Sequence, residues 1–167
     1  MRKLFEYIGK RITSAVDFFY PPFRKYMSLQ FFRYGTTGAS NLVFDWVLYF
    51  VIFNFVLQKQ MLFLGFVTLS SHIATLAFKF PVTMTTGFLL QKYVTFTDSS
   101  NKGKEQIWRY YIVGFTNLLL NYIGFKILVD LLHFYPSIAN VVISIALTVF
   151  SYISQKKFTF KILTKQD

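Results

Sequence analysis

The chain has 167 residues, of which 54% are hydrophobic, 21% are aromatic and only 15% are charged. A soluble domain is typically about 45–50% apolar and roughly 25% charged, so this composition indicates a membrane protein. The net charge of +11 does not indicate nucleic-acid binding, because the apolar stretches between the basic clusters leave no polar face for a duplex. With no cysteine and only two distant histidines, His72 and His133, we expect no disulfide, metal or other cofactor.

The first twenty residues predict an amphipathic helix. Between Arg2 and Phe19, apolar residues recur at helical spacing on one stripe, and Pro21 and Pro22 end the pattern. We expect this helix to lie in the headgroup layer of a membrane; a helix packed on a soluble partner is the alternative. Charges run throughout the segment, so a cleavable signal peptide is not expected.

Four apolar segments follow, each near or above the roughly 20 residues that cross a hydrocarbon core of about 30 Å. They are approximately Phe31–Leu57, Leu64–Leu90, Ile107–Leu132 and Pro136–Ser154. Very short links join the first to the second and the third to the fourth, so each pair should form a hairpin. The predicted fold is an all-α membrane protein with four transmembrane helices. Its interfacial helix lies in residues 1–28 and its membrane domain in residues 29–167, with hairpins 29–96 and 105–160.

Basic residues mark one side of the predicted spans. Fifteen of the 18 flank the chain termini or the central polar link, whereas the two short links carry only Lys59 between them. The positive-inside rule therefore predicts a multi-pass protein of the cytoplasmic (inner) membrane with both termini in the cytoplasm. Lys126 and Asp130, four residues apart near the outer end of the third span, are expected to form a local ion pair.

The two hairpins are copies of one sequence pattern. The first span reads QFFRYGTTGASNLVFDW from Gln30 and the third reads QIWRYYIVGFTNLLLNY from Gln106, at an offset of 76. The second and fourth spans end in QKYVTF from Gln91 and QKKFTF from Gln155, at an offset of 64. The difference of 12 residues means that the first hairpin is longer around its outer loop. Because each copy crosses twice, the copies should be parallel repeats related by an axis along the membrane normal.

The repeat places basic residues at the cytoplasmic mouth of each hairpin. An Arg guanidinium binds phosphate through two parallel hydrogen bonds, and a Lys beside it adds a point charge. The alternative is that these side chains only extend toward water and lipid headgroups. The candidate phosphate-binding residues are Arg33, Arg109, Lys92 and Lys156, with Gln91 and Gln155 beside the lysines.

Small and polar residues recur deeper in the first span of each copy. Gly38 and Gly114 are expected to let helices approach closely. Asn41 and Asn117 lie about a turn deeper, where an amide needs a partner. They either link helices or line a polar path for a substrate.

Two opposite charges are predicted to meet inside the first hairpin. Asp45 lies 14 residues beyond Phe31, and Lys79 lies 12 residues before Gln91, which puts them about 21 and 18 Å from the same side. A lone charge there costs at least about 2.5–3.5 kcal/mol, so a buried pair or an aqueous cavity is expected. The pair is either part of a translocation path or a structural salt bridge. The candidate path residues are Asn41, Asp45, Lys79, Asn117 and Asn121, the last replacing Asp45 in the second copy.

The pattern Arg-Tyr-x-x-x-Gly-x-x-Asn-Leu over Arg33–Leu42, with hairpins that end in Gln-Lys-x-x-Thr-Phe, resembles the GtrA-like family over about Leu29–Phe160. The resemblance implies a role in bacterial cell-surface polysaccharide synthesis, with polyprenyl-phosphate-linked monosaccharides moved to the outer leaflet for membrane glycosyltransferases. Some members of the family act instead as anchors for partner enzymes. The family's motif positions carry over to Arg33, Gly38, Asn41, Gln91, Lys92, Phe96, Gln155, Lys156 and Phe160.

Two functional hypotheses follow. A flippase for a lipid-linked sugar needs a basic mouth, a polar interior and apolar walls, and the sequence offers all three. A non-transporting adaptor that recruits a glycosyltransferase has little need of the polar interior.

A small multidrug exporter is not favoured, because such exporters typically rely on a glutamate within the membrane, whereas Glu6 and Glu105 lie outside the spans. The sequence shows no nucleophile–base pair and no metal site, so we do not expect an enzyme. The expected partners are the lipid-linked sugar, membrane lipids, membrane glycosyltransferases and further copies of this chain.

Overall fold

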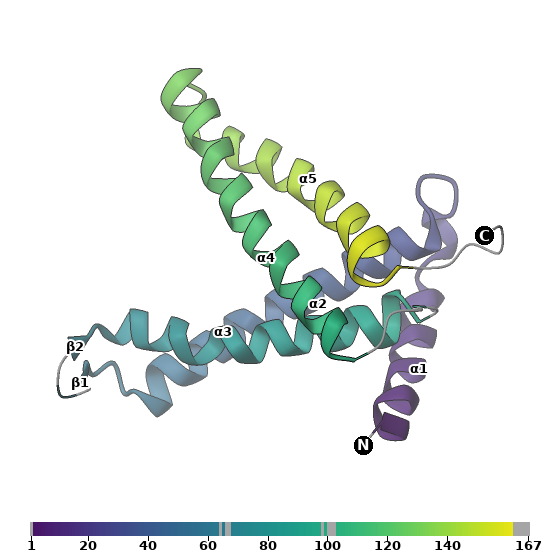
Figure 1. Cartoon of the computed structure of the whole chain (residues 1–167), viewed down its shortest axis with the longest axis horizontal. Coiled ribbons are helices and arrows are strands. Elements are labelled where there is room, and N and C mark those ends of the chain that lie inside the picture. Colours follow the sequence, from purple (N-terminus) through teal and green to yellow (C-terminus); the bar gives the residue numbers. More distant parts are fainter. Residues whose placement is uncertain (1, 64, 66–67, 98, 100–102, 162–167) are drawn as a thin grey trace. The chain divides into compact units, whose positions relative to one another are not determined.

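The computed structural model describes the chain except for residues 1, 64, 66–67, 98, 100–102 and 162–167 (Figure 1). Its long helices are α1 (Arg2–Phe18), α2 (Leu29–Val51), α3 (Ser71–Leu90), α4 (Lys104–Phe125) and α5 (Pro136–Ser154). With their extensions, four helical segments are long and apolar enough to cross a membrane: Leu29–Val56, Ser71–Thr95, Lys104–Leu131 and Pro136–Thr159. The predicted fold class, four transmembrane helices preceded by an N-terminal helix, is confirmed.

Each of the four long segments ends in a π-helical turn, in which hydrogen bonds reach five residues back rather than four. These turns are η2 (Ile52–Val56), η3 (Gln91–Thr95), η4 (Lys126–Leu131) and η5 (Gln155–Thr159). In η5, for example, the Phe160 amide donates to the Gln155 carbonyl at 2.8 Å. The repeated Gln-Lys-x-x-Thr pattern is therefore a structural unit, because η3 and η5 coincide with its two copies.

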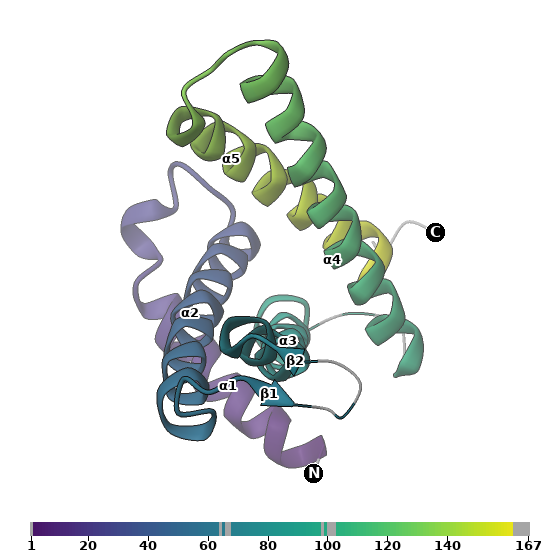
Figure 2. The same ribbon diagram turned by 90° about the vertical axis from the view of Figure 1, so that its left-hand side faces the viewer.

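The chain divides into two compact units, residues 1–95 and 96–167, each of which holds one hairpin. In the first unit α2 packs along α3, and α1 packs against α2 and η3. In the second unit α4 packs along α5, as Figure 2 shows. The end of each hairpin that carries the repeated Arg and Lys is called its basic end below.

The outer turn of the first hairpin is where the sequence prediction was wrong. The predicted start of the second span, Leu64, lies outside the described residues; β1 (Leu62–Phe63) pairs antiparallel with β2 (Thr68–Leu69), and α3 begins only at Ser71. Gly65, with φ of +86°, lies in the turn between the strands, in a conformation that favours glycine. This strand pair accounts for the predicted extra length of the first hairpin.

The outer end of the second hairpin also differs from expectation. Lys126 and Asp130 do not form an ion pair among the described residues; the Lys126 ammonium lies 5.9 Å from the centre of the Tyr122 ring. Both residues belong to η4, and a π-helical turn rotates positions four apart away from the common face that they share in an α-helix. The prediction assumed α-helical spacing.

Helix α1 is only partly covered by the hairpin. Gly9 and Val16 are buried, whereas Leu4 and Ile8 remain exposed. An added Cβ on Gly9 would lie 2.7 Å from the Tyr93 carbonyl oxygen, so only glycine allows this close approach. The exposed apolar residues of α1 fit the predicted position beside a lipid headgroup layer.

Candidate functional site

Arg33 is held by a carboxylate that the sequence did not assign to it. Its Nε donates to Asp17 Oδ1 at 2.8 Å, and its second guanidinium nitrogen donates to Asp17 Oδ2 at 2.6 Å. This two-bond geometry gives the strongest form of an Arg–carboxylate pair. It joins the last turn of α1 to the first turns of α2. The sequence feature that could have indicated this pair is Asp17 itself, which is the single acidic residue in the second half of the amphipathic segment.

Arg109, the repeat equivalent of Arg33, is also paired with a carboxylate. It donates to Glu105 one turn earlier, and it donates to the Phe158 carbonyl oxygen at 2.8 Å. Its guanidinium carbon lies 4.9 Å from the centre of the Phe158 ring. At both basic ends, the repeated arginine is therefore fixed in place by an acidic group.

Lys92 and Lys156 have matching surroundings in the two copies. The Lys92 ammonium lies 5.5 Å from the centre of the Phe88 ring, and the Lys156 ammonium lies 5.7 Å from that of Tyr152. In both cases the ring belongs to the residue four positions earlier. Such a cation–π contact contributes about 0.5–1 kcal/mol at an exposed site. Both lysines are half-buried, so each amine lies beside its helix end with its position restricted by the ring.

The glutamine before each lysine is buried in the π-helical turn. In the first copy, Gln91 Nε2 donates to Thr37 Oγ1 at 3.3 Å, and Thr37 Oγ1 lies 3.2 Å from Thr95 Oγ1. In the second copy, Val113 stands at the position of Thr37, so the equivalent hydroxyl is missing near Gln155.

Several buried side-chain oxygens lack a hydrogen-bond partner within the described chain. They are Oε1 of Gln91, Gln106 and Gln155, and Oδ1 of Asn117. Gln106 was not selected from the sequence, although it is the repeat equivalent of Gln30; its amide nitrogen donates to Ser99 Oγ at 2.8 Å. Buried acceptors without donors are rare in native structures, and they cluster here at repeated positions of both hairpins.

Both deeper asparagines connect the two helices of their hairpin. Asn41 donates to the Thr83 carbonyl at 3.2 Å and accepts from the Thr86 hydroxyl at 2.8 Å. Asn117 donates to Ser151 Oγ at 3.2 Å. The interhelical role foreseen for these amides is thus observed. Gly38 does not show the close packing predicted for it, since an added Cβ would meet no described atom within 4 Å.

The predicted ion pair inside the first hairpin is confirmed. The Lys79 ammonium contacts Asp45 Oδ2, with side chains only 15% and 22% exposed. The ammonium also lies 5.6 Å from the centre of the Tyr49 ring, whose hydroxyl lies 2.7 Å from His72 Nδ1. A row of polar and ionisable groups thus follows the contact between α2 and α3 toward the outer turn.

At the corresponding depth the second hairpin carries no charged pair. Ile143 aligns with Lys79, is 6% exposed and packs against Gly124, where an added Cβ would lie 3.1 Å from the isoleucine side chain. Asn121, which aligns with Asp45, is half-buried. The six residues predicted at the mouth fall into one set per unit: Arg33, Gln91 and Lys92 in the first, and Arg109, Gln155 and Lys156 in the second.

Four apolar helices, two of them joined by an internal ion pair, define a multi-pass membrane protein. The family described as "GtrA/DPMS, transmembrane domain" matches residues 33–160, and the chain belongs to this family. This is a membrane family involved in glycosylation and polysaccharide synthesis, and its domain is not a known catalytic fold. Comparisons with curated proteins and with solved structures gave no significant match. Helix α1 lies outside the matched residues.

Proposed function

We propose that this protein moves a polyprenyl-phosphate-linked monosaccharide from the cytoplasmic to the outer leaflet of the bacterial cytoplasmic membrane. A membrane glycosyltransferase then uses the sugar to modify a cell-surface polysaccharide. Membership of the GtrA/DPMS family supports a role in glycosylation and polysaccharide synthesis. The observation that carries the transport role is the Asp45–Lys79 pair, a costly feature in a segment that spans a membrane.

In this proposal the basic ends bind the phosphate of the lipid. Arg33 and Lys92 act in the first hairpin, and Arg109 and Lys156 act in the second. Asp17 and Glu105 keep the two guanidinium groups oriented while no substrate is bound. An arriving phosphate takes the place of the carboxylate, so the guanidinium group keeps an anionic partner throughout the exchange.

The sugar is proposed to bind the buried acceptor oxygens. Sugar hydroxyl groups donate hydrogen bonds, and the side-chain oxygens of Gln91, Gln155 and Asn117 lack donors within the described chain. Gln91 and Gln155 lie next to the lysines proposed to bind phosphate, as required for a sugar attached directly to that phosphate. Asn41, Asp45 and Lys79 are proposed to provide polar contacts for the substrate in the first hairpin, and Asn117 and Asn121 in the second.

The adaptor function remains the alternative, because the first hairpin satisfies much of its own polarity. Asn41 uses both its amide nitrogen and its oxygen within the hairpin. Asp17 likewise occupies the Arg33 fork. A hairpin closed in this way suits a protein that holds a glycosyltransferase in the membrane without moving lipid.

Reconstitution separates the two functions. Purified full-length protein is placed in liposomes that contain undecaprenyl-phosphate glucose, and the lipid in each leaflet is measured over time. Transport predicts faster equilibration than in protein-free liposomes and in liposomes with an Asp45→Asn, Lys79→Met double variant. Equal rates in all three would reject the flippase and favour the adaptor.

A further inference from the structure

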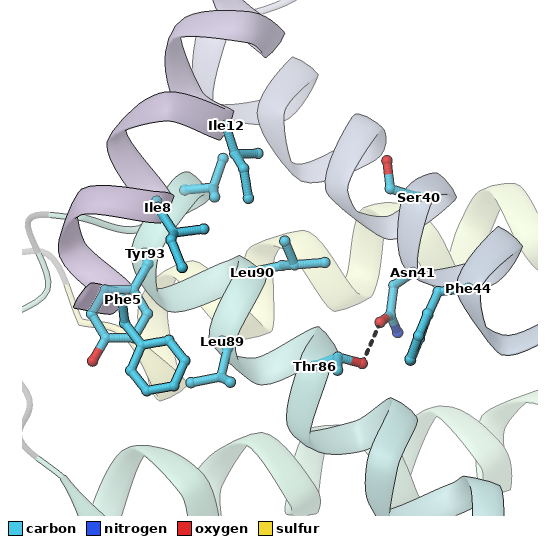
Figure 3. A pocket seen from close by; sticks show the side chains of 12 residues that line it. Phe5, Ile8, Ile12, Ser40, Asn41, Phe44, Thr86, Leu89, Leu90 and Tyr93 are labelled. Atoms are coloured by element: carbon cyan, nitrogen blue, oxygen red, sulfur yellow. Dashed lines mark hydrogen bonds between the residues drawn. The ribbon is translucent and has the colours of Figure 1, made fainter. Parts of the chain in front are cut away.

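The first unit contains a pocket of about 310 Å³, and Asn41 is the one residue of its lining to which a role is assigned above (Figure 3). It is bounded by α1, α2, α3 and η3. Phe5, Ile8 and Ile12 form the wall on α1, and Phe44, Leu89 and Leu90 lie among the residues opposite. This volume is at the lower end of the range for small-molecule sites.

The polar groups in this pocket are already engaged. Asn41 accepts from the Thr86 hydroxyl, as Figure 3 shows, and donates to the Thr83 carbonyl. Ser40 Oγ donates to the Thr36 carbonyl at 2.9 Å. A polar ligand would therefore lose hydrogen bonds to water without gaining donors here, whereas a hydrocarbon chain would lose none.

The wall formed by α1 is held firmly in place. Gly9 lies directly against the Tyr93 backbone, and the Phe5 and Tyr93 rings stack with centroids 5.8 Å apart. The Asp17–Arg33 ion pair holds the other end of α1. The pocket therefore lies beneath a helix that is anchored on both sides of it.

A positive charge lies at the rim. The Lys92 ammonium is 5.6 Å from the centre of the Tyr93 ring, and Tyr93 lines the pocket. Thr86 lies six residues before Lys92, or about 9 Å deeper along the helix. The pocket thus extends from a cation at the basic end into a segment that is apolar enough to span a membrane.

We propose that this pocket binds the first part of the hydrocarbon chain of a polyprenyl phosphate, with the phosphate at Lys92. The inference rests on the proposed function and adds to it a tail-binding site. Four of the twelve residues that line it belong to α1, which lies outside residues 33–160 matched to the family. Charge complementarity with Lys92 favours an anionic lipid over a neutral one.

The cysteine-free sequence allows a direct test. Ser40→Cys places a single thiol at the pocket, and Thr116→Cys places one at the equivalent position of the second hairpin, where Thr116 Oγ1 likewise bonds the carbonyl four residues earlier. Each full-length variant is reconstituted in phosphatidylcholine vesicles, and its alkylation by a membrane-permeant maleimide is timed. The vesicles contain no addition, undecaprenyl phosphate or phosphatidylglycerol.

Undecaprenyl phosphate is expected to slow alkylation of Ser40→Cys by at least about tenfold and to leave Thr116→Cys unchanged. A pocket-filling variant, Ser40→Phe, should weaken undecaprenyl phosphate binding by about tenfold, the loss expected when roughly two methylene groups stay outside an apolar site. Thr116→Phe is its control. Equal alkylation rates with and without the lipid, or equal protection by phosphatidylglycerol, would overturn the inference. Translocation by Ser40→Cys without protection would overturn this tail site and leave the proposed function standing.

Discussion

Asp17 and Arg33, sixteen residues apart, face each other as two planar groups joined by parallel hydrogen bonds of 2.8 and 2.6 Å. Through this pair, a helix outside the family's matched region holds the arginine at the start of the family motif. Any ligand that binds Arg33 through its guanidinium fork must therefore compete with Asp17. The position of α1 and anion binding at the basic end are coupled by this competition.

The first prediction follows from that competition. Arg33→Ala should weaken undecaprenyl phosphate binding by roughly ten- to a hundredfold, because one charge-assisted contact contributes about 1.5–3 kcal/mol. Asp17→Asn should strengthen binding, because the competing negative charge is removed. Binding is measured by titration of the purified protein in detergent. Lys25→Ala removes an exposed basic side chain and serves as control; affinities unchanged in both Arg33→Ala and Asp17→Asn would show that the arginine is structural only.

The second prediction concerns the purpose of the Asp45–Lys79 pair. Removing one partner leaves the other charge in an apolar surrounding, so each single substitution should lower thermal stability, at a cost of up to about 3–5 kcal/mol for a fully buried pair. The exchange Asp45→Lys with Lys79→Asp keeps the attraction and should restore near-normal melting. It should not restore translocation, because a negative charge on α3 would face the anionic lipid. Full transport by the exchanged protein would assign the pair a structural role alone.

The third prediction uses the difference between the two glutamine clusters. Val113→Thr should place in the second hairpin the hydroxyl that Thr37 provides in the first, at a buried position of similar volume. A hydrogen bond made to Gln155 should stabilise the protein by about 0.5–1.5 kcal/mol, and Thr37→Val should destabilise it by a comparable amount. Thermal unfolding in detergent measures both changes. Val141→Thr, at an exposed position, is the control, and the idea fails if Val113→Thr melts below the wild type.

The fourth prediction tests orientation in the membrane. Reporter fusions after Asp98 and at the C-terminus should report the cytoplasm, and a fusion near Lys59 should report the outer side. Paired fusions to a reporter active only in the cytoplasm and to one active only outside serve as mutual controls. A C-terminus outside the cytoplasm would reverse the proposed direction of transport and the role of the basic ends.

Helical spacing explains what the sequence could predict. The depth of Asp45 and Lys79 along their helices was enough to predict that they pair. The prediction is correct because both residues lie in regular helices with a fixed rise per residue. The same assumption failed for Lys126 and Asp130, which lie in a π-helical turn. Hydropathy also could not separate the strands Leu62–Phe63 and Thr68–Leu69 from the start of a helix, because short apolar runs suit both. Gly65 was the one local signal of a turn.

Tertiary contacts explain what could not be predicted. The partner of Arg33 lies beyond a turn at Pro21–Pro22 whose direction no residue pattern specifies. The pocket beneath α1 depends on how closely Gly9 approaches Tyr93, which is a property of packing rather than of periodicity. The repeat did locate Gln91 and Gln155, but it could not show that their side-chain oxygens are buried without donors.

The contrast between the ion pair of the first hairpin and the Gly124–Ile143 contact of the second has an electrical consequence. A movement that separates Asp45 from Lys79 along the membrane normal shifts charge across part of the bilayer. The membrane potential then does work on that movement, up to about 2.3 kcal/mol per elementary charge per 100 mV for a complete crossing. Asn121 and Ile143 carry no charge, so the same movement of α4 against α5 at that depth is electrically silent. Voltage therefore acts on the two hairpins unequally, and at this depth it acts through α2 and α3.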